Sequence, residues 1–551
     1  MKKSFLTFCL FTACMPLFAA ALLQPGNEFN VLRFVAEKNF MLLPVQDTAP
    51  EADVYVVYAN GQQGERMKVR LARERVEYYV PFDIKAYKGR EISVCITPVP
   101  EGMVCWDSIR FADEFEPLPC KYRPSGHFVP PYGWINDPNG MIYRNGEYHL
   151  FYQYNPYGCT WGNMHWGHAV STNLTDWEHL PVALAPDAWG GIFSGSCVQK
   201  QDTVFAFYTS AGARQTQSMA YSTDDGRTFT KYAGNPVIFS NVPDFRDPKL
   251  IWYAPDSVWI MVLAAGQQMD FYKSGNLRQW EYMSSFGKGY GCHDGVWECP
   301  DLLCFNAGGK NEKWVLFCNI NPGGPAGGSA TQYFTGSFNG REFVCDSDSS
   351  VTKWLDYGKD HYAAVTFTDA PDDRKISMAW MNNWQYAPLV PATHYRSAMT
   401  LPRDLQLFRH KGGYYLSSMP SKEVQYLPHY EISITVPKKS KAGLELKFSN
   451  AAGEYVTIKY DFAADTVVMD RAHSGITGFS DDFPVPTVAP LLDESGRYKL
   501  SVYLSASSVE AFGGTWCMTN NVYPSAPYDT FTYTATDKSV KVEYELKSNT
   551  K

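Results

Sequence analysis

Five short apolar runs recur along the middle of the chain, and they are rich in the aromatic and β-branched residues that favour strands. They occupy residues 148–154, 204–208, 258–262, 313–317 and 375–380. Their first residues are 56, 54, 55 and 62 positions apart, and each run follows a turn and an earlier short strand. A hairpin repeated at this interval predicts a five-bladed β-propeller, although an ordinary all-β domain can also carry loosely regular hairpins.

Strand-like patterns continue on both sides of the repeat. On the N-terminal side, residues 53–58, 76–80 and 92–96 predict a small β-sandwich-like domain. Three roles are open for this domain: glycan binding, packing against the propeller, and holding the propeller away from a membrane. We favour packing. On the C-terminal side, residues 431–436, 444–448, 455–460, 499–504 and 540–546 fit a second β-sandwich. We therefore expect an all-β chain with domains at 22–118, 119–423 and 424–551.

The first 21 residues have the pattern of an export signal. Two lysines follow Met1, residues 4–18 are largely apolar, and residues 19–21 are alanines suited to cleavage. The segment is too short for a convincing membrane span. We expect cleavage after Ala21. The alternative takes residues 11–14 as an imperfect lipoprotein box with a lipid anchor on Cys14, and both interpretations place the protein beyond the cytoplasmic membrane, in the periplasm or at the cell surface.

Composition narrows the class of ligand. Aromatic residues make up 15% of the 551 and charged residues only 19%, and the net charge of −8 comes without a Lys/Arg cluster. Nucleic acid is therefore not expected as a partner. Abundant aromatic residues suit an uncharged, hydroxyl-rich ligand such as a sugar, but they also fill ordinary β cores. The cysteines lack zinc spacing, so no metal and no cofactor is predicted, and the oligomeric state stays open.

Acidic residues recur shortly before the apolar runs. Asp137 and Asp247 each lie 11 residues before a run, and Glu298 and Asp360 each lie 15 before one. In a propeller, corresponding positions converge on the axis, so these acids are expected to form a ring at one mouth of the channel. Such a ring suits glycosidic bond cleavage, in which two carboxyl groups act together. Turn acids at blade edges and a calcium site are the alternatives, although the dense spacing of a calcium loop is missing.

Three sequence blocks at these acids resemble the signature blocks of glycoside hydrolase family 32, which includes invertases, inulinases, levanases and fructan β-fructosidases. The blocks are residues 134–140 (WINDPNG), 245–248 (FRDP) and 297–300 (WECP), and residues 507–512 (SSVEAF) resemble a block of the family's C-terminal sandwich. The resemblance implies a five-bladed catalytic propeller followed by a β-sandwich. It also implies that Asp137 is the nucleophile, Glu298 the general acid/base, and Asp247 the transition-state stabiliser that holds the fructosyl C3 and C4 hydroxyls.

The resemblance extends to the surroundings of these acids. The positions that match the family's fructosyl-binding subsite are Asn136, Gln153, Trp161, Phe193, Ser194 and Arg246. Trp297 and Trp384 are candidates for the pocket floor, with burial in a blade as the alternative. Asp360 and Tyr362 match a D-x-Y-A block, for which a structural role and a role beside the catalytic groups stay open. Cys299 is expected to pack against Glu298 rather than to react.

The expected function is that of a retaining β-fructofuranosidase that hydrolyses fructans of the levan or inulin type, and sucrose as well. An aspartate at position 137 fits exo action with release of fructose. The alternatives are an endo-acting levanase or inulinase, a fructosyltransferase, and a non-catalytic fructan-binding protein on the same propeller. The linkage preference, β-2,1 or β-2,6, is not indicated.

Overall fold

The computed structural model describes residues 22–24, 30–57, 62–97, 99–306, 308–310 and 312–548. The expected signal and Cys14 lie outside the described residues. Strands dominate these residues, and no helix among them is long and apolar enough to span a membrane. The chain divides into two compact units, residues 1–116 and 117–551, and each is described by itself.

The first unit contains two antiparallel sheets. The larger has the strand order β1 (Leu22–Gln24), β2 (Asn30–Val35), β7 (Glu91–Ile96), β4 (Ala52–Val57) and β5 (Met67–Val69). The smaller has the order β6 (Tyr78–Asp83), β3 (Phe40–Val45) and β8 (Arg110–Ala112), and the short helices are η1 (Lys85–Tyr87) and α1 (Val104–Ser108). Both sheets bury apolar side chains such as Leu43 and Val94 completely. The three predicted strands are all present, and the one expected at 76–80 runs over 78–83 instead.

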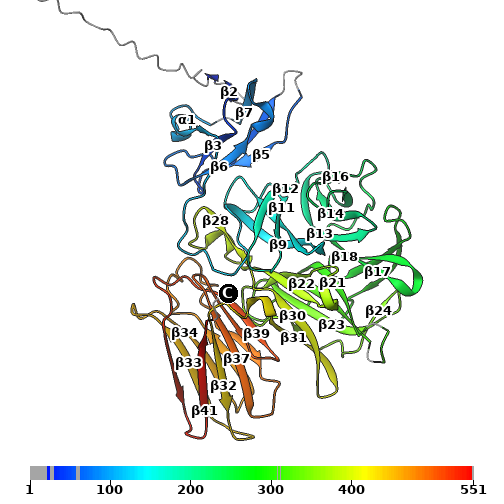
Figure 1. Ribbon diagram of the computed structural model, residues 1–551, viewed down its shortest axis with the longest axis vertical. Helices are drawn as coiled ribbons and strands as arrows, with labels where there is room; N and C mark the ends of the chain where they lie inside the picture. The colour runs from blue at the N-terminus through cyan, green and yellow to red at the C-terminus, as the bar shows by residue number, and fades with distance from the viewer. Residues whose placement is uncertain are drawn as a thin grey trace, which may run out of the picture. The chain divides into compact units, whose positions relative to one another are not determined.

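The five repeats form five sheets, coloured cyan to yellow in Figure 1. The first holds β9 (Gly133–Arg144), β10 (Glu147–Asn155), β11 (His165–Ser171) and β12 (Glu178–Leu184); the second holds β13 (Gly191–Lys200), β14 (Thr203–Ala211), β15 (Gln215–Ser222) and β16 (Thr230–Lys231). The third holds β17 (Phe245–Tyr253), β18 (Val258–Ala265), β19 (Met269–Ser274) and β20 (Glu281–Phe286), with η2 (Ala254–Asp256) between the first two.

The remaining two sheets complete the propeller. The fourth holds β21 (Val296–Phe305), β22 (Lys313–Asn321), β23 (Ala330–Phe338) and β24 (Phe343–Cys345); the fifth holds β26 (Tyr362–Thr366), β27 (Ile376–Met381), β30 (Arg403–His410) and β31 (Gly413–Pro420), with η3 (Pro371–Asp373) and η4 (Ala387–Leu389) between strands. Each predicted apolar run is the second strand of its blade. Three blades gain a fifth short strand, so they are not strictly four-stranded: β28 (Tyr395–Arg396), β25 (Lys353–Trp354) and β29 (Ala398–Met399).

The first strands of the blades form a closed ring, because each contacts the first strand of the next blade and β26 contacts β9. Each of these first strands also carries a β-bulge, where a stretch of three residue-to-residue steps pairs with only two steps on the neighbouring strand. The five bulges oppose residues 135–138 to 154–152, 192–195 to 210–208, 246–249 to 264–262, 298–301 to 319–317, and 362–365 to 380–378. A bulge changes the face to which the following side chains point. The repeat therefore re-aims side chains at one end of all five inner strands.

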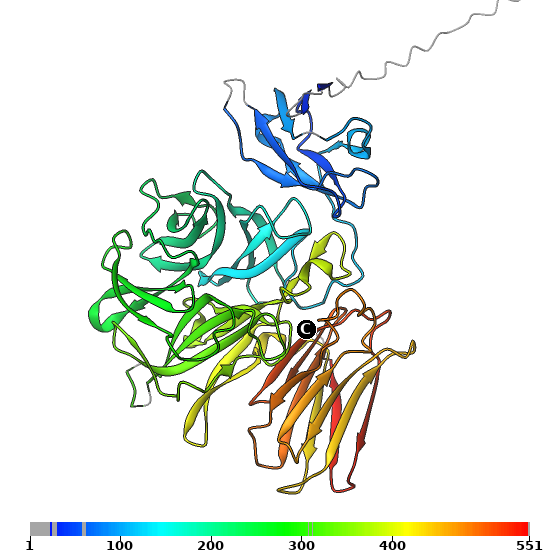
Figure 2. The same cartoon turned by 180° about the vertical axis from the view of Figure 1, so that it is seen from behind.

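A two-layered sandwich, orange to red in Figure 2, follows the propeller. One sheet has the order β39 (Cys517–Asn521), β38 (Ser508–Phe512), β37 (Arg497–Leu504), β32 (His429–Thr435) and β41 (Lys541–Lys547); the other has β36 (Thr487–Pro490), β35 (Thr466–Asp470), β34 (Tyr455–Asp461), β33 (Gly443–Ser449) and β40 (Thr530–Ala535). The short η5 (Lys422–Val424) precedes it. Buried ion pairs join it to the propeller: Arg403 binds Glu510, and Arg471 binds Asp360.

Candidate active site

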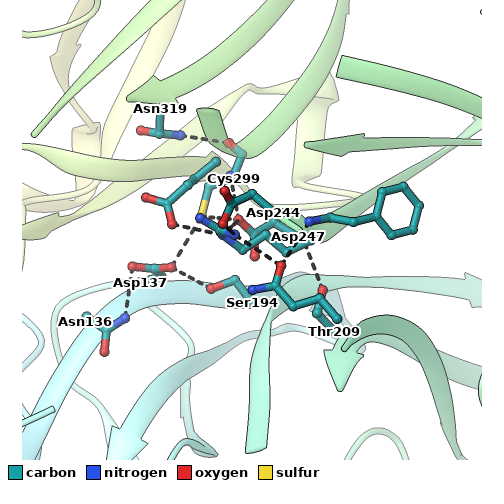
Figure 3. A network of polar contacts seen from close by, with 12 residues as sticks. Asn136, Asp137, Ser194, Thr209, Asp244, Asp247, Cys299 and Asn319 are labelled. Atoms are coloured by element: carbon teal, nitrogen blue, oxygen red, sulfur yellow. Dashed lines mark hydrogen bonds and ion pairs between the residues drawn. The ribbon is translucent and has the colours of Figure 1, made fainter. Parts of the chain in front are cut away.

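Three carboxyl side chains lie at one end of the inner strands, within a bulge or directly before it. Asp137 lies on β9, Asp247 on β17 and Glu298 on β21. The Cys299 thiol lies 3.3 Å from Asp137 Oδ2 and 3.5 Å from Asp247 Oδ2. Arg246 Nε lies 3.0 Å from Glu298 Oε1 and 4.0 Å from Asp247 Oδ2. One thiol and one guanidinium therefore connect all three carboxyl groups, as Figure 3 shows for Asp137, Cys299 and Asp247.

Asp137 is oriented by three donors. Asn136 Nδ2 donates to Oδ1 at 3.1 Å, whereas Ser194 Oγ and the Cys299 thiol donate to Oδ2 at 2.6 and 3.3 Å (Figure 3). Asn136 is itself held by the Trp134 indole, which donates to its Oδ1 at 2.9 Å. The Asp137 side chain remains half-buried. A fixed, partly accessible carboxylate is what a nucleophile on a rigid strand requires.

Asp247 occupies the bulge of the third blade with a φ of +65°, a conformation that aspartate tolerates better than most residues. Its backbone N–H donates to Thr209 Oγ1 at 2.9 Å, and its Oδ2 accepts the Cys299 backbone N–H at 2.9 Å. The residue is 4% exposed. Burial raises the pKa of Asp247 to about 7, and the Arg246 guanidinium opposes that rise.

Glu298 is held from both sides. The Tyr362 hydroxyl donates to its Oε2, and Arg246 Nε donates to its Oε1. Burial raises the pKa of Glu298 above its usual value, Arg246 opposes the rise, and the nearby Asp137 charge adds to it. The carboxyl group therefore keeps its proton to a higher pH than an ordinary glutamate, which suits a general acid.

Arg246 is fixed by two further side chains, neither of which is among the predicted site residues. Its Nη1 donates to Asp244 Oδ1 at 2.7 Å and to Gln215 Oε1 at 3.1 Å. Asp244 lies two residues before Arg246, and side chains two apart share one face of an extended chain. The D-x-R spacing is a signal that could have revealed this pair.

The ring of four acids is wrong in two respects. First, the carboxylates do not share one position: Asp137 is the second residue of its bulge, Asp247 the first, and Glu298 precedes its bulge. Second, Asp360 lies away from the other three, because its Oδ1 accepts from Tyr386 and its Oδ2 from Arg471 and the backbone of Asn521 in the sandwich. The fifth blade contributes Tyr362 instead.

Trp297 lies beneath the site rather than on its surface. It is 0% exposed, its indole donates to Cys292 O at 2.9 Å, and its ring stacks on His293 with centroids 4.9 Å apart. The prediction that it binds substrate is therefore wrong, and the alternative of a tryptophan buried in a blade is correct. Trp384 is partly buried against Trp134 and Trp380.

The other subsite candidates cluster around Ser194. Phe193, the residue before it, contacts the Trp161 ring edge-to-face with centroids 6.0 Å apart, and Trp161 is 46% exposed. Gln153 is buried and donates to the backbone of Ile192 at 2.9 Å. Three candidates therefore contact the carboxyl groups directly, namely Asn136, Ser194 and Arg246. In the described part of the chain, no group of three His, Cys, Asp or Glu residues is placed to hold a metal ion.

Comparisons with known proteins agree with this architecture. The model of the "Glycosyl hydrolases family 32 N-terminal domain" matches residues 127–420, and that of the family's C-terminal domain matches residues 411–548. Residues 26–125 match a domain of unknown function, DUF4980.

Individual relatives cover most of the chain. A levanase of Bacillus subtilis (strain 168) is 41% identical over 77% of this chain and 69% of its own length. An extracellular exo-inulinase of Aspergillus awamori is 36% identical over 74% and 90%. The crystal structure of an exo-inulinase from Aspergillus awamori covers 78% of this chain and 99% of its own, with a TM-score of 0.72 and 34% identity. With both family models matched in order across the propeller and the sandwich, the chain belongs to glycosyl hydrolase family 32.

Proposed function

We propose that the protein is a retaining, exo-acting β-fructofuranosidase that releases fructose from fructans of the levan or inulin type and also cleaves sucrose. The observation that carries the proposal is the contrast between two neighbouring carboxyl groups. Asp137 is held by three donors, whereas burial raises the pKa of Glu298. One group is thus arranged as a nucleophile and the other as a proton donor, the division of roles that a retaining glycosidase needs.

The first chemical step forms a covalent intermediate. An Asp137 oxygen attacks the anomeric C2 of the terminal fructosyl unit, the C2–O bond to the rest of the chain breaks, and Glu298 gives its proton to the departing oxygen. A retaining pair is expected about 5–5.5 Å apart. Asp247 accepts hydrogen bonds from the C3 and C4 hydroxyls as the ring flattens, and Arg246 holds Asp247 and Glu298 in place.

The second step reverses the roles. Glu298, now ionised, takes a proton from water, and the resulting hydroxide oxygen bonds to C2 while the bond to Asp137 breaks. Fructose leaves with its original anomeric configuration, and both carboxyl groups return to their starting protonation states. Tyr362, through its hydroxyl on Glu298 Oε2, stabilises the ionised form that this second step requires.

The substrate class rests on the relatives, which are named levanase and exo-inulinase. Separate digestion of levan, inulin and sucrose tests it. We expect fructose as the sole early product from either polymer, and fructose with glucose from sucrose. A ladder of oligosaccharides identifies endo action, products longer than the substrate identify transfer, and binding without cleavage identifies a non-catalytic protein.

We also propose the domain boundaries 22–118, 119–423 and 424–551 and export beyond the cytoplasmic membrane. Support for the boundaries comes from the unit division after residue 116 and from the ranges of the three family models. Support for export comes from the pattern of residues 1–21 and from the extracellular exo-inulinase. Membrane fractionation of the Cys14→Ala variant decides between a soluble and a lipid-anchored protein: release of the protein identifies the anchor.

A further inference from the structure

A cavity of about 690 Å³ opens at the ends of the inner strands that lie opposite the carboxyl cluster. Trp252 near the end of β17 and Thr366 at the end of β26 line it, whereas Asp247 and Tyr362 stand near the starts of the same strands. The five residue-to-residue steps from Asp247 to Trp252 span about 16 Å of strand. The volume falls within the range of about 300–1,000 Å³ that is usual for small-molecule sites.

The cavity is separate from the carboxyl cluster. Between them lies a void of only about 10 Å³, lined in part by Pro138, Pro248 and Pro300. That volume is about the space of a single water molecule. Lys249 lies across this narrow zone, where its Nζ donates to Asp301 Oδ2 at 3.0 Å and to Thr366 O at 3.0 Å. A sugar in one mouth therefore has no passage to the other.

The cavity walls offer flat aromatic surface. Trp252 is 49% exposed, although it is a large apolar side chain, and its ring meets Trp259 edge-to-face with centroids 5.0 Å apart. Trp314 and Phe367 also line the cavity. Aromatic walls with a few polar groups are typical of ligand sites, and an exposed indole face packs well on the apolar face of a sugar ring.

The charge balance of the walls points to a neutral ligand. Among the described residues, Trp259 Nε1, Thr368 Oγ1 and Asp301 Oδ1 have no hydrogen-bond partner. They are a donor, a hydroxyl that can donate or accept, and an acceptor, but all three atoms are buried beneath the cavity surface, so they make the walls polar without being direct contacts of a ligand. The cations are largely neutralised: Lys249 pairs with Asp301, Arg374 with Asp404 and Glu423, and Lys375 with Asp373.

We propose that this cavity is a second, non-catalytic sugar-binding site, which takes a fructosyl segment of the same polymer that the carboxyl cluster cleaves. The identity of the sugar rests on the proposed function. Occupation of this site by one chain segment raises the effective concentration of polymer near the catalytic mouth. Short substrates gain nothing from it, because one molecule cannot occupy both mouths.

Calorimetric titration with a fructo-oligosaccharide tests the proposal. The Asp137→Asn background keeps the ligand intact, and we expect two binding events per chain. Adding Trp252→Ala, which removes the indole face, should abolish one of them. Trp252→Phe keeps a smaller aromatic ring at the same position, so it should weaken the same event without affecting folding. Tyr282→Ala, on the outer strand of the same blade and 53% exposed in the native protein, is the control and should leave both events unchanged.

Kinetics of the catalytically intact enzyme complete the test. Trp252→Ala should raise the KM for polymer severalfold, Trp252→Phe should raise it less, and both should leave kcat/KM for sucrose unchanged. A single binding event in the Asp137→Asn background, or two events that survive both variants, would overturn the proposal. If the wild-type enzyme cleaves the oligosaccharide but only one binding event is seen, the proposal of a second site is refuted while the proposed function stands. If wild type cleaves no fructoside, the proposed function fails.

Discussion

At the scale of single residues, the two catalytic candidates can be told apart by the leaving group. Glu298→Gln removes the proposed proton donor, so hydrolysis of natural fructans should fall by about 10²–10⁴-fold. An aryl fructoside with an acidic leaving group needs little protonation, so its first step should be largely spared, and added azide should restore turnover. Equal losses on both substrates without azide rescue would remove Glu298 from the acid/base role.

Two matched variants complete this comparison. Asp137→Asn removes the proposed nucleophile and should stop turnover of both substrates, whatever the leaving group. Asp247→Asn should slow both substrates alike, because contacts with the sugar hydroxyls act in the transition state irrespective of the leaving group. A variant that affects only the natural substrate identifies an acid/base residue rather than a stabiliser.

The pH profile tests the contact between Tyr362 and Glu298. The hydroxyl donates to the ionised carboxylate and so lowers the pKa of Glu298, against the rise that burial causes. Tyr362→Phe should therefore raise this pKa further. Because the first step of the proposed mechanism needs protonated Glu298, activity should be lost as pH rises through its pKa, and the basic limb of kcat/KM should move to higher pH. Tyr386→Phe, whose hydroxyl binds Asp360 instead, should leave that limb in place.

At the scale of strands, the bulge on β21 links the carboxyl groups through one residue. Cys299 has a φ of +41°, its backbone N–H donates to Asp247, and its thiol faces both Asp137 and Asp247. Burial raises the pKa of the thiol well above its usual value, so it remains protonated as a donor.

Cys299→Ala should lower kcat/KM by roughly tenfold, because a hydrogen bond to a charged group is worth about 1.5 kcal/mol. The backbone bond to Asp247 remains, so the fold should be kept. Cys299→Ser preserves a donor and should lose less than the alanine variant. Cys345→Ala, on the outer strand of the same blade, is the control. Unchanged kinetics in Cys299→Ala would show that the thiol only fills space.

At the scale of the whole molecule, a buried ion pair ties the sandwich to the fifth blade. Arg471 and Asp360 are 1% and 0% exposed, and both are surrounded by further hydrogen bonds. Arg471→Met should reduce the free energy of unfolding by about 3–5 kcal/mol, because it leaves a carboxylate buried without its partner. Denaturant unfolding measures this loss, and kcat/KM of the folded fraction should stay within twofold of wild type.

Two further variants separate this effect from general damage. The double replacement Arg471→Met/Asp360→Asn should recover part of the lost stability, because no charge is then left unpaired. Lys411→Met breaks an exposed ion pair with Glu494 of the sandwich and should change stability little. If Asp360→Asn keeps wild-type stability but loses most of its kcat/KM, Asp360 takes part in the active site after all.

Much of this architecture could be predicted from the sequence because its determinants are local. Apolar runs bounded by turns predict hairpins wherever the chain goes, and their even spacing predicts five blades. The number of residues between each acid and the next apolar run also places Asp137, Asp247 and Glu298 near the starts of inner strands. The resemblance of three blocks then supplied candidate roles for them.

What only the tertiary structure decided is the direction in which side chains point. A shift of one residue turns every later side chain of a strand to its other face, and each inner strand carries such a shift. Spacing alone therefore could not show toward which face Asp137 and Asp247 turn. It also could not show that Tyr362 reaches Glu298 or that Trp297 is buried, because both depend on packing between separate segments of the chain. Nor could it place Arg471, more than a hundred residues away, against Asp360. Sequence periodicity sets where a strand begins, but packing between distant segments determines which side chains meet.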